Sequence, residues 1–254
     1  MKINFNYAAA IAVMVLSAFI TTSCNDNDEN GVAIISTNLC TAEVDLTNHY
    51  RFYTDDDIVV EMDNESNSIL FNTFGSKAER VSLIYQYRDV DATVVNGVRH
   101  VSNAQVLNGT QLIDIENITT KASAEAKNQL ATDSIFEVST IESFYAHKGY
   151  LNCIIKAPYA ALNNKAVYPG ITLFADQSDI KENEMTLHLY YNCHAPKNAL
   201  TGYLSSFAKS YPLSMFANRI PGTDDITLKL IVEGQSNPKT KTFKMTRSDF
   251  FRPF

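Results

Sequence analysis

The sequence predicts an all-β protein, in which a small β-barrel or sandwich is followed by an antiparallel β-sandwich, with one short helix between them. Three observations predict this class. Short runs rich in Val, Ile, Thr and Tyr recur between turn signals. Several runs alternate apolar with polar residues, as half-buried strands do. One segment alone, residues 121–133, has a helix-forming composition. The 254 residues are enough for one large β domain or two small ones.

The first group of predicted strands lies within residues 32–120. Val81–Tyr87 (VSLIYQY) places alternate residues on one apolar face. Asn96 and Gly97 stand between two valine-rich stretches and predict a tight hairpin. The runs in this group are Val32–Ile35, Arg51–Tyr53, Ile58–Met62, Ser68–Phe71, Val81–Tyr87 and Val94–Val101. Five or so strands in fewer than about 90 residues fit a small barrel or sandwich.

The second group of predicted strands lies within residues 134–254. Its runs are Ile135–Phe144, Tyr150–Lys156, Ile171–Phe174, Met185–Cys193, Ile226–Val232 and Thr242–Met245. His147-Lys148-Gly149 predicts a hairpin turn between the first two strands. Spacing and alternation predict an antiparallel sandwich of about 110 residues. Between the groups, Lys121–Asp133 (KASAEAKNQLATD) predicts a short, solvated helix that links the two domains.

The N-terminus predicts a signal peptide over residues 1–23. Lys2 supplies a positive charge, and Tyr7–Ile20 is an apolar run without charge. About 14 residues at ~1.5 Å each are too short to cross a ~30 Å hydrocarbon core, as expected for a signal peptide. The stretch Thr21-Thr22-Ser23-Cys24 then resembles a relaxed bacterial lipobox, with Thr21 in place of the usual Leu. Cys24 is therefore the predicted lipidation site and first mature residue.

Residues 24–31 form a predicted acidic tether with the sequence CNDNDENG. Two or more acyl chains on Cys24 would hold the membrane stably, since each buried CH₂ contributes ~0.8 kcal/mol. In some gram-negative anaerobes a similar acidic stretch serves as a surface-export signal, and a flexible spacer explains it equally well. The expected location is thus the outer membrane of such an organism, through the lipid anchor, with surface exposure left open.

Charge and motif content exclude several functions. The net charge of −7 and the absence of a basic stripe argue against a nucleic-acid partner. The sequence contains no G-x-S-x-G, no H-E-x-x-H and no Gly-rich phosphate loop. No catalytic residue, cofactor or metal site is predicted, and the protein is expected not to be an enzyme.

Two histidine arrangements in the sequence could form chemical sites. His188 and His194 share strand parity with Tyr190 and Asn192, so they could hold a metal, but no carboxylate is in register. The outward polar face of a half-exposed strand explains them better. Cys193 and His194 are adjacent, and neighbours on a strand point to opposite faces, which argues against a nucleophile–base pair.

Acidic residues and cysteines offer weaker signals. The run Asp55–Asp57, followed by Glu61, Asp63 and Glu65, could bind Ca²⁺ but lacks EF-hand spacing, so a solvated loop and an acidic strand edge are favoured. Besides Cys24, the mature chain has three cysteines, Cys40, Cys153 and Cys193. Cys153 and Cys193 are both expected on apolar faces; a disulfide is open, and inert core thiols are favoured.

Aromatic residues raise the alternative of a sugar-stacking platform. The aromatics concerned are Phe144, Tyr145, Tyr190, Tyr191, Tyr203, Phe207 and Tyr211. Tryptophan, the strongest platform residue, is absent. Aromatic residues at strand spacing are usually core, which is the interpretation favoured here.

Short motifs in both halves resemble those of NigD-like proteins, a family of lipoproteins from gram-negative anaerobes. Arg80–Tyr85 begins with Arg and ends in Tyr, like the corresponding family strand. The further motifs, in family order, are Ile115–Lys121, Ile135–Val138, Gly149–Asn152, Leu187–Asn192 and Tyr211–Ser214. The resemblance implies an OB-like barrel over residues 32–120 and a β-sandwich over residues 134–254. It rests on the order and spacing of the motifs, which cover nearly the whole mature chain.

The resemblance also implies a function. The family takes its name from a bacteriocin operon in which one member is a proposed immunity protein, and for most members no activity is implied. The expected function is therefore that of a non-catalytic envelope lipoprotein, protein-binding or bacteriocin-immunity-like. The alternative is a glycan-binding accessory lipoprotein of a polysaccharide-utilisation system. The predicted partners are the membrane and an unknown protein or glycan.

Overall fold

A computed structural model divides the chain into two compact units, which meet in sequence at Ile115 and Glu116. The structure describes residues 31, 33–127, 129–130, 138–163, 165–167, 170–192, 195, 199–214, 225–234, 237 and 239–246. Cys24, the predicted signal peptide and all but Gly31 of the predicted tether lie outside these residues. No helix within the described ranges is long and apolar enough to span a membrane.

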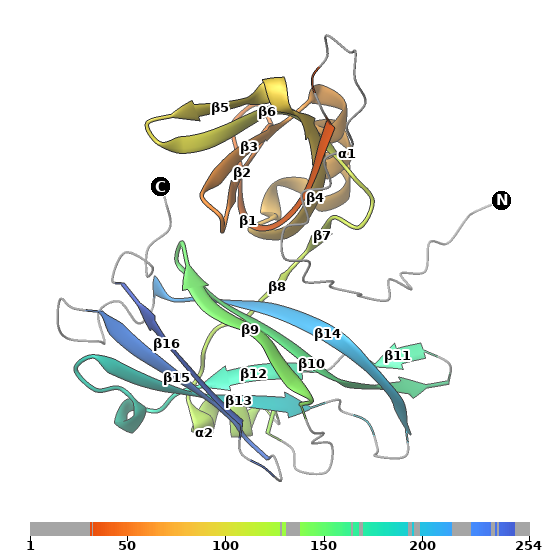
Figure 1. Cartoon of the computed structure of the whole chain (residues 1–254). Coiled ribbons are helices and arrows are strands. Elements are labelled where there is room, and N and C mark those ends of the chain that lie inside the picture. Colours follow the sequence, from red (N-terminus) through yellow and green to blue (C-terminus); the bar gives the residue numbers. More distant parts are fainter. Residues whose placement is uncertain are drawn as a thin grey trace. The chain divides into compact units, whose positions relative to one another are not determined.

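The first unit is a closed five-stranded barrel (Figure 1). Its strands are β1 (Ala33–Val44), β2 (Tyr50–Thr54), β3 (Ile58–Met62), β4 (Arg80–Arg88) and β6 (Val98–Val106), joined by the edge strands β5 (Ala92–Val95) and β7 (Gln111–Leu112) and followed by β8 (Asp114–Ile115). Strand β1 pairs with both β2 and β4, β3 runs parallel to β6, and β6 pairs back to β4. The predicted OB-like barrel is confirmed.

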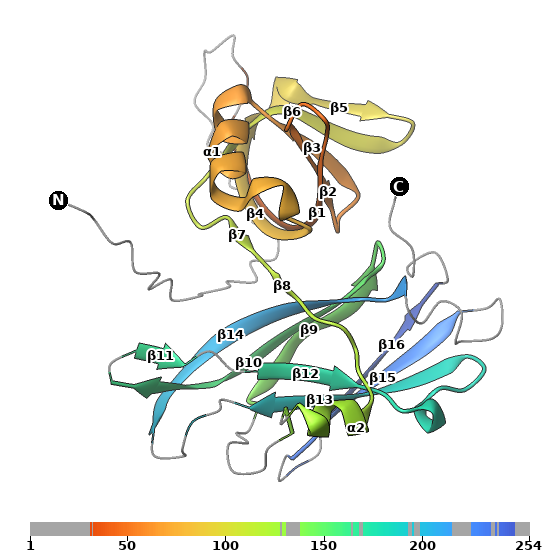
Figure 2. The ribbon, with the colours of Figure 1, turned by 180° about the vertical axis from the view of Figure 1, so that it is seen from behind.

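The predicted strand Ser68–Phe71 is wrong, because this segment lies in helix α1 (Asn64–Phe74). Asp63 begins the helix by accepting a hydrogen bond from the Ser66 N–H at 2.7 Å, and Gly75 ends it at φ +65°. The apolar run does not all face one way: Leu70 is buried whereas Ile69 is 50% exposed. Figure 2 shows α1 alongside the barrel strands. The short 3₁₀ turns η1 (Gly75–Lys77) and η2 (Asp89–Asp91) flank β4.

The second unit is a β-sandwich of two sheets. One has the order β11 (Lys165–Val167), β10 (Tyr150–Leu162), β14 (Leu200–Pro212), β8, with β9 (Thr140–His147) paired to β10. The other has the order β12 (Gly170–Phe174), β13 (Glu184–Asn192), β15 (Ile226–Val232), β16 (Lys239–Met245). The predicted sandwich is confirmed. Strand β10 pairs antiparallel with β9, β11 and β14, as do β12 with β13 and β15 with β16, whereas β13 and β15 run parallel. The 3₁₀ turn η4 (Gln177–Asp179) lies between β12 and β13.

Two predicted turns form as expected, and the predicted helix is shorter than expected. Asn96 and Gly97 both have positive φ, as do Lys148 and Gly149, which suits tight two-residue hairpins. Helix α2 covers only Lys121–Ala126 of the predicted 121–133, with the described residues 127, 129 and 130 in turn conformation. Its Ala124 is fully buried, so the helix is not solvated on every side.

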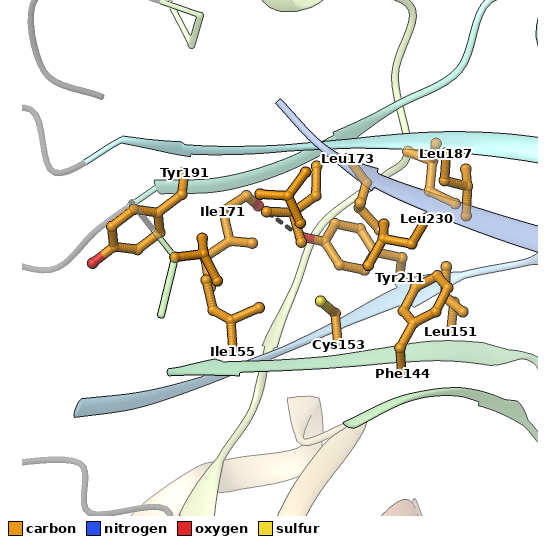
Figure 3. Close-up of a cluster of buried hydrophobic side chains, with 14 of the residues drawn as sticks. Phe144, Leu151, Cys153, Ile155, Ile171, Leu173, Leu187, Tyr191, Tyr211 and Leu230 are labelled. Atoms are coloured by element: carbon orange, nitrogen blue, oxygen red, sulfur yellow. Dashed lines mark hydrogen bonds between the residues drawn. The ribbon is translucent and has the colours of Figure 1, made fainter. Parts of the chain in front are cut away.

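The sandwich core is held by apolar packing and by tyrosine hydroxyls that reach from one sheet to the other. Figure 3 shows side chains of β12, β13 and β15 facing those of β9, β10 and β14. The Tyr211 hydroxyl, from β14, donates to the carbonyl of Ile171 in β12 at 2.6 Å. The Tyr191 hydroxyl, from β13, donates to the carbonyl of Pro158 in β10 at 2.5 Å. Each sheet thus supplies one tyrosine that satisfies a backbone carbonyl of the other.

Candidate functional site

Exposed apolar side chains concentrate on the β5–β6 hairpin of the barrel unit and the 3₁₀ turn before it. Val90 is 60% exposed, Val94 72%, Val95 48% and Val98 36%. Of the eleven large apolar side chains exposed in the described residues, these four fall within residues 90–98, whereas the others are scattered. Single exposed apolar residues are ordinary, but four of them within nine residues make this segment the candidate interaction surface. We call Val90, Val94, Val95 and Val98 the valine hairpin.

The pairing register defines which groups of the hairpin face outward. Val95 pairs with Val98 across the Asn96-Gly97 turn, and Val94 pairs with Arg99. Residues that flank a two-residue turn exchange hydrogen bonds, and the next pair does not. The N–H and C=O of Val94 therefore point away from β6. Strand β5 is the first strand in the order of its sheet, so these groups lie on its open edge within the described residues.

Acidic groups lie close to the hairpin in the barrel sheet. Ile58 opens β3 opposite Arg99 of β6, and the exposed Asp56 and Asp57 directly precede it. The whole unit is acidic: residues 31–115 contain twelve Asp and Glu against five Lys and Arg, a net charge of −7. Residues 116–254 contain thirteen and fifteen, a net charge of +2. The negative charge of residues 31–254 is therefore concentrated in the unit that carries the valine hairpin.

The acidic run that could have bound Ca²⁺ has structural roles instead. Asp55 receives two hydrogen bonds from the Arg80 guanidinium, at 3.0 and 2.8 Å, and Arg80 also donates to the Thr41 hydroxyl at 3.0 Å. Arg80 is fully buried. The favoured solvated loop is thus wrong for Asp55, although Asp56 and Asp57 are exposed as expected.

The remaining acids of that run, Glu61, Asp63 and Glu65, lie in or beside strand β3 and helix α1. Glu61 binds Arg51 at 2.7 Å, and Asp63 caps helix α1, whose first turn contains Glu65. The predicted acidic strand edge is therefore correct for Glu61 and wrong for Asp63 and Glu65. Within the described ranges, no group of three or more His, Cys, Asp or Glu is placed to hold a metal ion.

His188 does have carboxylates beside it, which the sequence pattern did not indicate. Its Nδ1 lies 2.5 Å from Glu233 Oε1, and its Nε2 lies 3.5 Å from Asp179 Oδ1. The ring also stacks on Phe174, with centroids 5.1 Å apart. The two carboxylates sit on opposite ring nitrogens, so they orient the imidazole and do not converge with it on one ion. His194 and Cys193 lie outside the described residues.

The aromatic residues of the proposed sugar platform are mostly core, as the favoured interpretation predicts. Phe144, Tyr190, Tyr191, Phe207 and Tyr211 are each less than 9% exposed. Tyr145 is half-buried, and Tyr203 is 72% exposed. One exposed ring does not form a stacking platform.

The cysteines within the described residues are buried. Cys153 is a free thiol inside the sandwich core, and burial raises its pKa to about 12. A thiol is neutral and unreactive well below its pKa. The favoured inert core thiol is confirmed for Cys153. Cys40 is fully buried in the barrel.

Neither a protein-family model nor a curated protein matches the chain. Solved structures do share its two-unit fold, with TM-scores of 0.54 to 0.58 over about 85% of this chain. One is a NigD-like immunity protein from Bacteroides caccae, 12% identical, covered over 96% of its length with a TM-score of 0.54. Another is a candidate toxin-related protein from Parabacteroides distasonis, 15% identical, covered over 95% with a TM-score of 0.58. A third is a candidate lipoprotein from Bacteroides fragilis, 14% identical, covered over 98% with a TM-score of 0.57.

These similarities define the class of protein by its fold: an OB-like barrel followed by a β-sandwich, found in proteins of Bacteroides and Parabacteroides. The resemblance to NigD-like proteins, expected from short motifs, is confirmed at the level of fold. Arg80–Tyr85, the strand with the family pattern, is also explained. Arg80 forms the buried ion pair of the barrel, and the Tyr85 hydroxyl donates to Asn38 Oδ1 at 3.1 Å.

Proposed function

We propose that this chain is a non-catalytic lipoprotein of the cell envelope whose barrel unit binds another protein, as a bacteriocin-immunity-like module would. The observation that carries the proposal is the valine hairpin. Its four exposed valines lie outside the core cluster of the barrel, and solvating their exposed surface is unfavourable by ~25 cal/mol per Å². A partner surface that covers them would remove this cost.

The anchor is the second part of the proposal. Cys24 follows a charge-free apolar run and precedes an acidic stretch, and acylation there would hold the chain on the outer membrane. The solved structure called a candidate lipoprotein supports this, and the one called a NigD-like immunity protein supports a binding role. Cys24→Ala should release soluble protein or leave the precursor uncleaved. Unchanged partition into a detergent phase would contradict the anchor.

Several contacts support a non-catalytic role. The buried Arg80 guanidinium and the Asp55 carboxylate form an ion pair with each other in the barrel unit. Both ring nitrogens of His188 face carboxylates, and the Cys153 thiol is buried in the sandwich core. General acid–base or nucleophilic catalysis requires such groups to reach one substrate atom. The glycan alternative is less well supported, because the candidate stacking rings are mostly in the core.

One experiment tests the binding function as a whole. Envelope proteins are cross-linked to the full chain, and the complexes are identified by mass spectrometry and quantified. A single stoichiometric protein partner is the expected result. Binding to a panel of envelope glycans, with no protein partner, would favour the glycan alternative and contradict the proposal.

A further inference from the structure

We infer that the partner binds the open edge of β5 as an added strand, through an extended segment that alternates apolar with basic side chains. This inference rests on the proposed protein-binding function and specifies the site and the partner's chemistry. The first argument comes from the backbone. The N–H and C=O of Val94 point to the open edge, where an extended segment can pair with them.

The second argument comes from how the two units treat their edge strands. Strand β16, the last strand of the sandwich sheet, carries Lys239, Lys241 and Lys244, and the Lys239 ammonium donates to the Ser139 carbonyl at 2.9 Å. Lysines are a common protection of sheet edges against pairing with another chain. Strand β5 has the sequence ATVV, without a charge, a proline or a bulge. Its edge is thus open to pairing, whereas the β16 edge is protected.

The third argument concerns the side chains that a partner strand would meet. Val94 is the more exposed of the two valines of β5, at 72%, and Val95 and Val98 lie opposite each other on the other face of the hairpin. An added strand places alternate side chains on the two faces, so apolar residues at every second position would cover the valines. This is the apolar half of the proposed pattern.

The fourth argument concerns charge. Asp56 and Asp57 are exposed at the start of β3, which borders the β6 arm of the hairpin on the side away from β5, and the unit carries a net charge of −7. A basic segment is attracted to this unit from a distance and an acidic one is repelled. The intervening side chains of the added strand are therefore basic.

Two end-blocked eight-residue peptides test the inference, one alternating valine with lysine and the other alternating valine with glutamate. Each is titrated into the full chain labelled with ¹⁵N, and amide shifts and hydrogen exchange are followed. The valine–lysine peptide should shift and protect the Val94 amide, and its affinity should fall as salt is raised. The valine–glutamate peptide should bind about tenfold or more weakly.

Variants separate the backbone and charge contributions. Val94→Pro removes the outward N–H but no hydrogen bond between β5 and β6, and should weaken the valine–lysine peptide about tenfold or more. Asp57→Asn suits the positive φ of that position and should weaken the same peptide about threefold without weakening the valine–glutamate peptide. Ile69→Ala, a change at an exposed apolar residue of α1, is the matched control and should alter neither affinity.

Equal affinity of the two peptides, or wild-type affinity of a folded Val94→Pro variant, would overturn the inference. Should Val94→Pro disturb the hairpin, the Asp57→Asn result and the position of the shifted amides decide instead. Shifts centred away from β5 contradict the edge site. If a protein partner is captured equally by wild type and Val94→Pro, protein binding stands and the β5 site fails. If neither peptide nor any partner binds, both proposals fail.

Discussion

The barrel and the sandwich place their polar and apolar groups in opposite ways. The barrel buries an ion pair, Arg80 with Asp55, and leaves valines exposed on its hairpin. The sandwich fills its core with apolar side chains, satisfies internal carbonyls with tyrosine hydroxyls, and protects an edge strand with lysines. The barrel holds the net negative charge and the sandwich is slightly positive.

This difference supports the proposal that the barrel is the unit that binds a partner. An open uncharged edge and solvated valines do not help the barrel to fold, and both are features that the proposed binding would use. Strand β16 of the sandwich shows the opposite treatment of a sheet edge, because it carries three lysines. The buried ion pair indicates a barrel whose local geometry depends on one specific polar contact. Stability and binding should therefore be separable by mutation.

The largest expected effect is on the barrel. Asp55→Ala would leave the Arg80 charge buried without its carboxylate, which should reduce the free energy of unfolding by about 3–5 kcal/mol. Hydrogen exchange of the β4 amides, recorded at increasing urea concentration, measures this loss for the barrel itself. A probe within the barrel is needed because the two units need not unfold together. Glu61→Ala, which removes an exposed partner of Arg51, is the matched control and should cost less than about 1 kcal/mol. Equal costs for the two variants would refute the distinction.

The next effect is on the sandwich. Tyr211→Phe removes the hydroxyl that donates to the Ile171 carbonyl in the opposite sheet, and should cost about 1–3 kcal/mol. Exchange of amides in β12 and β14 reports it. Tyr203→Phe alters a hydroxyl on a ring that is 72% exposed and should leave stability unchanged. A loss of unfolding free energy in Tyr211→Phe no larger than in Tyr203→Phe would mean that the Tyr211 hydroxyl does not tie the sheets together.

Cys153 offers a pH test of the sandwich core. The pKa of its thiol is raised by burial from 9.0 to about 12, so the neutral form is favoured in the folded state. The stability that the folded state gains from keeping this thiol neutral is fully present below pH 9 and is lost as pH rises from 9 toward about 12. At pH 8 alkylation of Cys153, followed by peptide mass mapping, should be at least about a hundredfold slower in native than in urea-unfolded protein. Equal rates would show that the thiol is accessible.

The smallest stability effect belongs to the hairpin. Val94→Thr keeps the branched shape and the N–H, and should change the free energy of unfolding by less than about 0.5 kcal/mol because the side chain is exposed. Binding to the partner should nevertheless weaken. Thermal unfolding and the peptide titration give the two values on the same sample. A loss of stability larger than the loss of binding energy would assign Val94 to the fold.

Much of the fold could be predicted because strands and hairpins have local signals. Ile58–Met62 and Ile226–Val232 form strands with the predicted bounds, and Asn96-Gly97 turns the hairpin as expected. Helix α1 was missed because its apolar run is short, although Asp63 and Gly75 are cap signals that could have indicated it. Strand β14 was missed because its sequence, LTGYLSSFAKSYP, does not alternate cleanly.

The contacts that decide the candidate site could not be predicted, since they join residues far apart in sequence. Asp55 and Arg80 are 25 residues apart, and His188 and Glu233 are 45 apart. The parallel pairing of β13 with β15 and of β3 with β6 likewise depends on the whole topology. The hairpin was predictable as a turn, but its place at a sheet edge follows only from the strand order.

Site-specific photo-cross-linking tests the central claim, that the barrel hairpin binds the protein partner. A photoreactive residue is placed at Val94 or at Tyr203, which are both 72% exposed and belong to different units. After irradiation of intact cells, the Val94 position should give one dominant cross-linked protein and the Tyr203 position should give little of it. Cross-linking of the same protein mainly from Tyr203, with none from Val94, would contradict the account.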